Sequence, residues 1–181
     1  MAADPTTDPV LIVVECLAHV GRAFRHPNAV TAAIAFATRG VRSLSPIGLN
    51  VERGRIVGPL RTAQHPPDVV ATVSPSYWRA PMLHQHGKPS LSGDPEALDL
   101  VGEFLGSDGF RTAVGETGDR CAAVLRGVLT QEFTAGRLTR PDIDRLISGT
   151  RRGMSFFRVM ATPQFAHARD EFARRMRADI E

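Results

Sequence analysis

The spacing of hydrophobic positions along the chain changes twice and divides it into three parts. Residues 8–24 repeat apolar side chains on one helical face, and Asp8 and Pro9 supply a helix cap and a first turn. Residues 28–39 are rich in alanine and are followed by Gly40, a residue that favours helix ends. The first part of the chain therefore predicts two helices.

Short strands are predicted in the second part. Leu49, Val51 and Ile56 alternate around Gly54, which predicts a hairpin whose glycine adopts a positive φ angle. Residues 69–73 and 90–92 predict two further strands, because each is a short run bounded by turn residues. Residues 76–83 predict a short helix between them, and the run that starts at Asp94 predicts a capped helix up to Leu105.

Beyond Gly106 the hydrophobic spacing is helical throughout. A helix over residues 121–133 ends near Gly136, a capping box formed by Thr139 and Asp142 opens the next helix, and an apolar stripe marks the last one. The predicted fold class is α+β: a small antiparallel sheet covered by helices, with a helical C-terminal third. We expect a single domain over residues 1–181. In it, residues 8–106 form the α+β part with its N-terminal helices, and residues 107–181 form a helical extension packed on that part.

Composition narrows the classes of partner. Of the 181 residues 43% are hydrophobic, which suits one globular domain, whereas 6% aromatic content leaves no set of rings on which bases could stack. The net charge is +3, but charges alternate in sign along the chain, so a nucleic-acid partner is not predicted. The longest apolar run, residues 9–16, is too short to cross a bilayer. We expect a cytoplasmic protein without stable membrane insertion, with Cys16 and Cys121 as buried free thiols.

Two histidines form the most suggestive short motif for chemistry. His84 and His86 are two residues apart, so on an extended chain both imidazoles face the same side and could share a metal ion or transfer protons. No third ligand stands at an obvious spacing, although His65, Asp94 or Glu96 could fold nearby, and the alternative is a polar exposed loop. No cofactor is predicted, because the metalloprotease, phosphate-loop, hydrolase-elbow and dinucleotide motifs are all missing from the sequence.

One carboxylate and a group of arginines are further candidates. Glu15 lies within a strongly apolar helix, where burial would raise its pKa and suit it to general acid or base catalysis. A solvent-exposed position beside the apolar stripe is the alternative. Arg151 and Arg152, with Arg126 and Arg158, could bind a carboxylate or phosphate group, or they could form a solvated helix face.

The middle of the chain resembles the sterol carrier protein 2 family of small α+β domains. The residues that carry the resemblance are GLNVERGRI for a hairpin, PPDVVATVS for a strand, YWRAPML for a short helix, and GKPSLSGDPEALDLVGEFL for a strand, a turn and an apolar helix. They cover about residues 47–105. The resemblance implies an apolar tunnel between sheet and helices. Its lining candidates are Trp78, Met82, Leu91, Leu98, Val101 and Phe104, with Phe156, Phe157 and Met160 as a lid, and the alternative is that all of these are core residues.

Three functions follow from these features. The first is non-covalent binding or transfer of an apolar small molecule, such as a fatty acyl, sterol or polyketide-like compound, in an internal cavity. The second is a small cofactor-free or metal-assisted enzyme of the cyclase or isomerase type, in which Glu15, His84 or His86 transfers protons. The third is a helical module that forms a homodimer or receives a partner through the apolar SFFRVM segment.

Overall fold

The computed structural model describes residues 8–39, 47–60, 66–73, 88–151 and 156–180, without the side chains of residues 10, 38, 47, 149–151, 156 and 157. The first element is α1 (Pro9–Gly21), whose first helical hydrogen bond runs from the amide of Ile12 to the carbonyl of Asp8 over 3.1 Å. Side chains on nearly every side of α1 are buried: Ile12, Val13, Val14, Cys16, Leu17, Ala18 and Val20. A helix that is apolar all round is stable only inside a protein.

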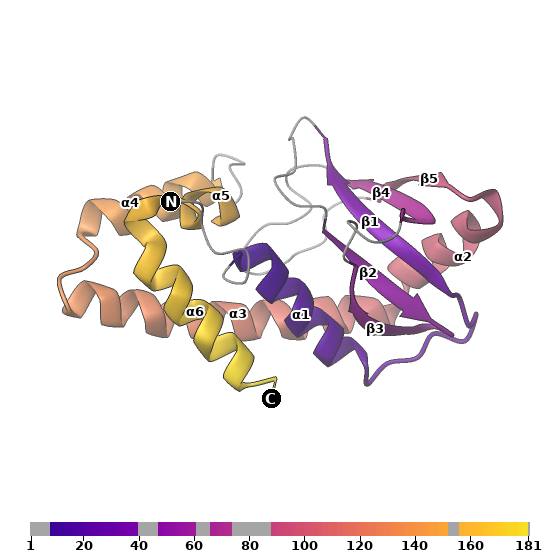
Figure 1. The fold of residues 1–181 in the computed structure, drawn as a ribbon, viewed down its shortest axis with the longest axis horizontal. Coiled ribbons are helices and arrows are strands. Elements are labelled where there is room, and N and C mark those ends of the chain that lie inside the picture. Colours follow the sequence, from indigo (N-terminus) through magenta and orange to yellow (C-terminus); the bar gives the residue numbers. More distant parts are fainter. Residues whose placement is uncertain (1–7, 40–46, 61–65, 74–87, 152–155, 181) are drawn as a thin grey trace.

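Five strands form one mixed sheet in the order β3-β2-β1-β4-β5 (Figure 1). The strands are β1 (Ala32–Thr38), β2 (Ile47–Glu52), β3 (Arg55–Pro59), β4 (Val69–Val73) and β5 (Ser90–Gly93). β1 and β4 are parallel, and the three other pairings are antiparallel. The predicted α+β class is confirmed, while the sheet is mixed and not antiparallel throughout.

The predicted second helix over residues 28–39 is wrong, because β1 occupies this segment and lies at the centre of the sheet. β1 is covered on both faces: Ile34 is fully buried on one, and Ala35 is 8% exposed on the other. A strand that is buried on both faces shows no alternation of apolar and polar residues, so this segment lacks the pattern by which strands are predicted. Its many alanines favour a helix instead. Tertiary packing overrides that helix propensity here.

The β2–β3 hairpin, β4 and β5 lie where the sequence predicted strands, and the caps at Asp94 and at Thr139 with Asp142 were also predicted correctly. The Asp94 side chain accepts a hydrogen bond from the amide of Glu96 at the start of α2 (Pro95–Gly106). Asp142 accepts hydrogen bonds of 2.8 and 2.6 Å from the amide and hydroxyl of Thr139 and so begins α4 (Arg140–Arg151). Local hydrogen bonds thus fix the ends of these helices.

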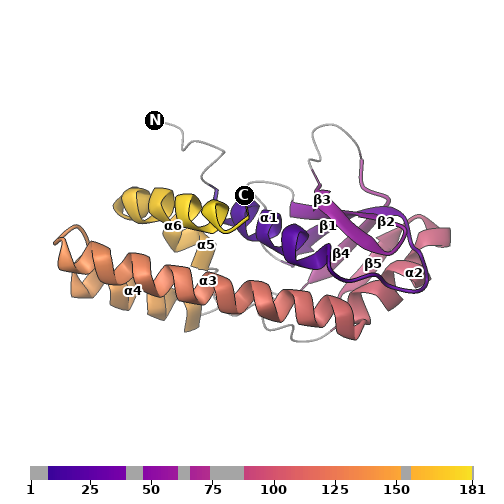
Figure 2. The ribbon, with the colours of Figure 1, turned by 90° about the horizontal axis from the view of Figure 1, so that it is seen from below.

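The C-terminal third is helical, as predicted. It contains α3 (Asp108–Thr134), α4, α5 (Phe156–Met160), the 3-10 helix η2 (Pro163–Phe165) and α6 (Ala166–Ala178). The 27 residues of α3 span about 40 Å, from the sheet to the far end of the molecule (Figure 1). α1 and α6 lie along the same side of α3 (Figure 2).

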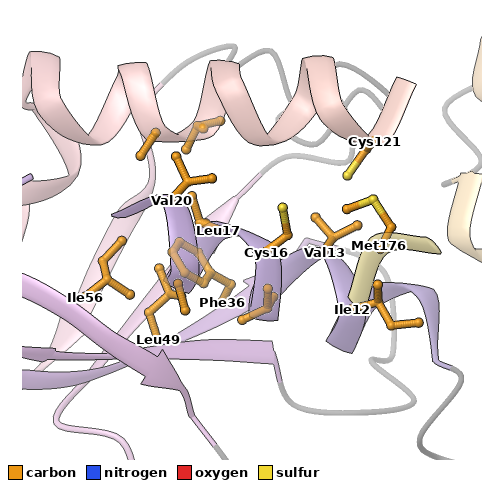
Figure 3. Packing of buried hydrophobic residues seen from close by; sticks show 14 of the residues in the cluster. Ile12, Val13, Cys16, Leu17, Val20, Phe36, Leu49, Ile56, Cys121 and Met176 are labelled. Atoms are coloured by element: carbon orange, nitrogen blue, oxygen red, sulfur yellow. The ribbon is translucent and has the colours of Figure 1, made fainter. Parts of the chain in front are cut away.

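α1 connects the sheet to the C-terminal helices. On one side it contacts β2 and β3, and on the other it contacts α3 and α6. Figure 3 shows Phe36, Leu49 and Ile56 of the sheet on the first side, and Cys121 and Met176 on the second. One continuous hydrophobic cluster includes all these residues, so the C-terminal helices share the core of the sheet. Among the described residues no helix is both long and apolar enough to span a membrane.

We predict that Leu17→Ala lowers the free energy of unfolding by about 2–5 kcal/mol, because Leu17 is 2% exposed in the shared core. Leu100→Ala is the control, since Leu100 is 38% exposed on α2 and its truncation is expected to cost about 0.5 kcal/mol or less. Urea denaturation followed by circular dichroism measures both variants. Separate transitions for the sheet and the helices in the wild-type protein would contradict a shared core.

Candidate functional site

A pocket of about 410 Å³ lies at the C-terminal end of α1. Its walls come from three places that are distant in the sequence: the segment after α1, the β2–β3 turn, and the junction between α2 and α3. The lining residues are Gly21, Phe24, Arg25, His26, Pro27, Gly54, Ile56, Phe104, Ser107, Asp108, Gly109, Phe110 and Ala113. Most of this surface is apolar, and a few polar groups are gathered in the loop and at the start of α3.

Backbone hydrogen bonds hold the loop wall against the hairpin. The amide of His26 donates to the carbonyl of Gly54 over 2.8 Å, and the amide of Gly54 donates to the carbonyl of Val30 over 2.8 Å. Gly54 has φ +76°, and a Cβ atom there would lie 2.2 Å from the carbonyl oxygen of His26. Only glycine therefore fits this turn, as the hairpin pattern predicted.

Asn28 holds the same loop against α2. Its side-chain nitrogen donates to the carbonyl of Leu100 over 2.9 Å and to the carboxylate of Glu103 over 3.3 Å. Its side-chain oxygen accepts from the amide of Val30 over 3.1 Å. One amide side chain thus links the segment after α1 to α2, the helix that leads into α3.

Aromatic rings form the apolar surface of the pocket. The ring centroids of Phe104 and Phe110 lie 5.5 Å apart. The ring centroids of His26 and Phe104 lie 6.1 Å apart, and these two rings form a T-shaped pair. Phe104 and Phe110 are buried, and Phe24 packs against the core as a partly buried residue. Phe24 is therefore the ring with the most surface open to the pocket, and the two buried rings form its floor.

The polar side chains of the pocket are those of Arg25, His26, Ser107 and Asp108, and they include both donors and acceptors. Nδ1 of His26 accepts a hydrogen bond from the amide of Asn28 over 3.2 Å, which places the proton of the neutral ring on Nε2. Nε of Arg25 donates to the carbonyl of Arg53 over 3.3 Å. The Ser107 hydroxyl is used locally, since it donates to Phe104 and accepts from the amide of Phe110.

The chain matches no protein-family model, and it has no significant match among curated proteins or solved structures. A concave, mainly apolar site with a few polar groups can hold a small molecule without covalent chemistry.

Of the predicted lining residues, Phe104 contributes to this pocket. Val101 and Met160 are fully buried in the core, and Leu91 and Leu98 are partly buried against it. Trp78 and Met82 lie outside the described residues. Phe156 and Phe157 belong to α5, but their side chains are not among those described.

The predicted metal motif cannot be placed, because His84, His86 and His65 lie outside the described residues. Asp94 and Glu96 stand at the start of α2, where Asp94 acts as the helix cap. Within the described part of the chain no group of three histidine, cysteine, aspartate or glutamate residues could hold a metal ion.

Glu15 lies away from the pocket. Its carboxylate accepts a hydrogen bond from Nε of Arg177 over 3.2 Å, and 24% of its side chain is exposed. This ion pair joins α1 to α6 at the edge of their contact. The ion pair provides a partner for the carboxylate of Glu15, the acidic residue of α1.

The two cysteines are buried and free, as predicted. Burial raises the pKa of the Cys16 thiol, although the nearby Arg120 guanidinium lowers it in part. Burial also raises the pKa of Cys121 to about 12. Both side chains are therefore neutral thiols at neutral pH, which makes them poor nucleophiles.

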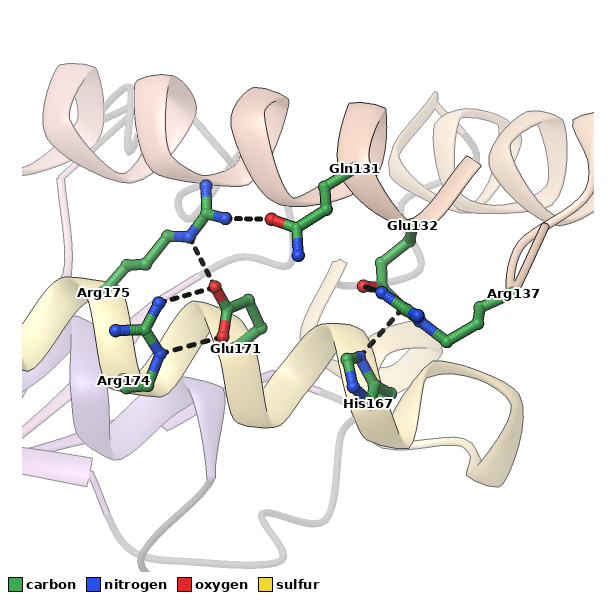
Figure 4. Close-up of polar contacts among 7 residues, drawn as sticks. All are labelled: Gln131, Glu132, Arg137, His167, Glu171, Arg174 and Arg175. Atoms are coloured by element: carbon green, nitrogen blue, oxygen red, sulfur yellow. Dashed lines mark hydrogen bonds and ion pairs between the residues drawn. The ribbon is translucent and has the colours of Figure 1, made fainter. Parts of the chain in front are cut away.

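A buried carboxylate that the sequence analysis did not single out connects the C-terminal helices. Glu132 is 1% exposed and accepts two hydrogen bonds of 2.8 Å from the Arg137 guanidinium, while Nδ1 of His167 lies 3.0 Å from its carboxylate (Figure 4). The Arg137 hydrogen bonds hold the pKa of Glu132 below its ordinary value, against the effect of burial. Its spacing from Leu125 and Val128 places it in the buried register of α3, which is a signal that the sequence does contain.

A second polar cluster lies beside the first on α6. Glu171 accepts hydrogen bonds from Arg174 and Arg175, which lower its pKa to about 2, and Arg175 also donates to Gln131 of α3 (Figure 4). Of these bonds, the one from Arg175 to Gln131 joins α6 to α3, and the others lie within α6. Both clusters are saturated by their own partners, so we assign them a structural role.

We predict that Glu132→Gln destabilises the protein by about 1–3 kcal/mol near pH 7, through loss of the charged hydrogen bonds to Arg137. Because the folded-state pKa of Glu132 is lowered, the contribution of the carboxylate is present above its ordinary value of 4.5 and is lost as pH falls through the folded value. The difference between variant and wild type should therefore shrink below pH 4.5.

Urea denaturation between pH 3 and 8 measures this difference. Glu116→Gln is the control, since Glu116 is an exposed glutamate on the same helix and its removal is expected to leave stability nearly unchanged at each pH. A Glu132→Gln penalty that stays constant down to pH 3 would show that the charge of Glu132 is not what stabilises the contact.

Proposed function

We propose that this protein binds an apolar small molecule non-covalently in the pocket at the end of α1. The observation that supports this most directly is the aromatic lining by Phe24, Phe104 and Phe110 around a volume of about 410 Å³. Ligand pockets in proteins commonly measure about 300–1,000 Å³ and are lined mainly by apolar and aromatic side chains.

The energetics favour a hydrocarbon ligand. Each methylene group moved from water into such a pocket contributes about 0.8 kcal/mol, so a chain of several carbons offsets the entropy lost on binding. The rigid mounting of the walls by Asn28 and Gly54 supports the proposal further, because a site that is already formed loses less entropy when the ligand binds.

The resemblance to the sterol carrier protein 2 family implies the same class of ligand, and we include membership of that family in the proposal. Of the segments that carry it, those within the described residues correspond to β2, β3, β4, β5 and α2, whereas YWRAPML lies outside them; α2 supplies Phe104 to the pocket. We also propose that the protein acts in the cytoplasm, a reducing compartment that suits two free buried thiols. The subunit number and any resident molecule can be read together from native mass spectrometry of freshly purified protein.

We predict that Gly109→Leu weakens binding of a neutral apolar probe, decan-1-ol, at least tenfold. A Cβ atom at Gly109 would meet Phe24 at ordinary contact distances of 3.6–3.9 Å, so a leucine side chain can enter the pocket without displacing backbone. Gly115→Leu is the matched control: Gly115 is on the same helix, it has open space around it, and it does not line the pocket. Both substitutions replace a helical glycine, so their effects on helix stability should be similar.

Isothermal titration calorimetry measures the dissociation constant of each variant. The proposal expects measurable binding to the wild type and to Gly115→Leu, with at least a tenfold loss in Gly109→Leu. Equal binding by all three proteins would place the ligand elsewhere. No binding of decan-1-ol to any of them would reject the proposed function for this class of ligand.

A further inference from the structure

We propose that Cys16, Cys121 and Met176 form a buried binding site for a soft monovalent metal ion, Cu(I). The site lies where α1, α3 and α6 meet. None of the three residues lines the pocket at the end of α1, so this inference is independent of the proposed function.

Three helices bring the three sulfur atoms together. Cys16 belongs to α1, Cys121 to α3 and Met176 to α6, and each of these helices contacts the other two. Figure 3 shows the two thiols and the thioether pointing into the same space. Cys16 and Met176 are fully buried, and Cys121 is buried as well. Each helix thus contributes one sulfur ligand to the same place in the core.

The chemistry of the donors selects the metal. Thiolate and thioether sulfur atoms are soft ligands that suit Cu(I), whereas a structural zinc site takes four ligands from cysteine, histidine and carboxylate side chains. Among the described residues no histidine or carboxylate joins the two cysteines in such a group, so the thioether of Met176 is the third donor. The set therefore fits Cu(I) better than Zn²⁺.

The site does not require an additional cavity. Metal–sulfur bonds of about 2.3 Å place three ligands around one ion about 4 Å apart, which is close to the ordinary contact distance between packed atoms. Sulfur atoms that pack against one another in a core can therefore hold the ion after small side-chain movements.

The charges around Cys16 support the assignment. Burial keeps both thiols neutral without a metal, and two thiolates there would repel one another. A Cu(I) ion bound by two thiolates leaves one net negative charge, for which the nearby Arg120 guanidinium is a counter-charge, while Asp179 acts in the opposite sense. Nη1 of Arg120 is buried and has no hydrogen-bond partner among the described residues, so a donor is left over beside the site.

Binding changes no oxidation state. Copper arrives as Cu(I) and remains Cu(I), and its bonds to the carrier that delivered it break. Each thiol gives its proton to the solvent as a copper–thiolate bond forms, and the thioether of Met176 binds without losing a proton.

The test titrates the reduced protein with Cu(I) in the absence of oxygen, in competition with the chromogenic chelator bathocuproine disulfonate. X-ray absorption spectroscopy then counts the sulfur ligands. The wild type should bind one ion through three sulfur atoms at about 2.3 Å. Cys16→Ala and Cys121→Ala should each weaken binding at least about 100-fold, and Met176→Leu should weaken it about tenfold and leave two sulfur ligands.

Met160→Leu is the matched control, because Met160 is a fully buried methionine of the same core but belongs to α5. It should keep wild-type affinity and three sulfur ligands. Circular dichroism shows whether each variant is folded, and the methionine variants keep the test decisive because leucine has nearly the volume of methionine. Full loss of copper to the chelator in the wild type would overturn the proposal. Unchanged affinity in Met176→Leu, or nitrogen ligands in the spectrum, would also overturn it and would direct attention to histidines such as His84 and His86.

Discussion

The burial of α1 on all sides is the constraint on which the rest of the structure depends. A helix with Ile12, Cys16 and Leu17 facing different neighbours cannot be stable alone in water, so the sheet must cover one side of it and α3 with α6 the other. The ion pair of Glu15 with Arg177 lies at the margin of this packing, where one charge can remain partly solvated. The polar clusters around Glu132 and Glu171 then fix the position of α6 along α3 (Figure 4).

The pocket is a consequence of where α1 ends. After Gly21 the chain leaves the shared core and turns across the junction between α2 and α3, where Asn28 attaches it to α2. Phe110 is buried in the core where it borders the pocket, and Phe24 is partly buried against the core on the opposite wall. Because the walls belong to the same packed unit as α1, the site is rigid, and rigid sites lose little entropy when a ligand binds.

Local signals predicted most of the elements, and long-range packing accounts for those that were missed. The Asp94 cap, the Thr139 and Asp142 pair and the β2–β3 hairpin each depend on residues within a few positions of one another. β1 was predicted as a helix because its burial on both faces removes the alternation by which strands are recognised. Among the residues predicted to line a cavity, only Phe104 lines this pocket. The other walls come from segments that are distant in the sequence, and periodicity within one segment does not predict which segments pack together.

Photoaffinity labelling tests the central claim, that the pocket at the end of α1 holds an apolar ligand, most directly. The wild-type protein is irradiated with an aliphatic diazirine probe, and the labelled peptides are identified by mass spectrometry. The account predicts that label is concentrated in residues 21–27 and 104–113, which supply most of the pocket lining, and that excess unlabelled decan-1-ol removes it. Label concentrated on α4, α5 or α6, or spread evenly over the chain, would contradict the claim.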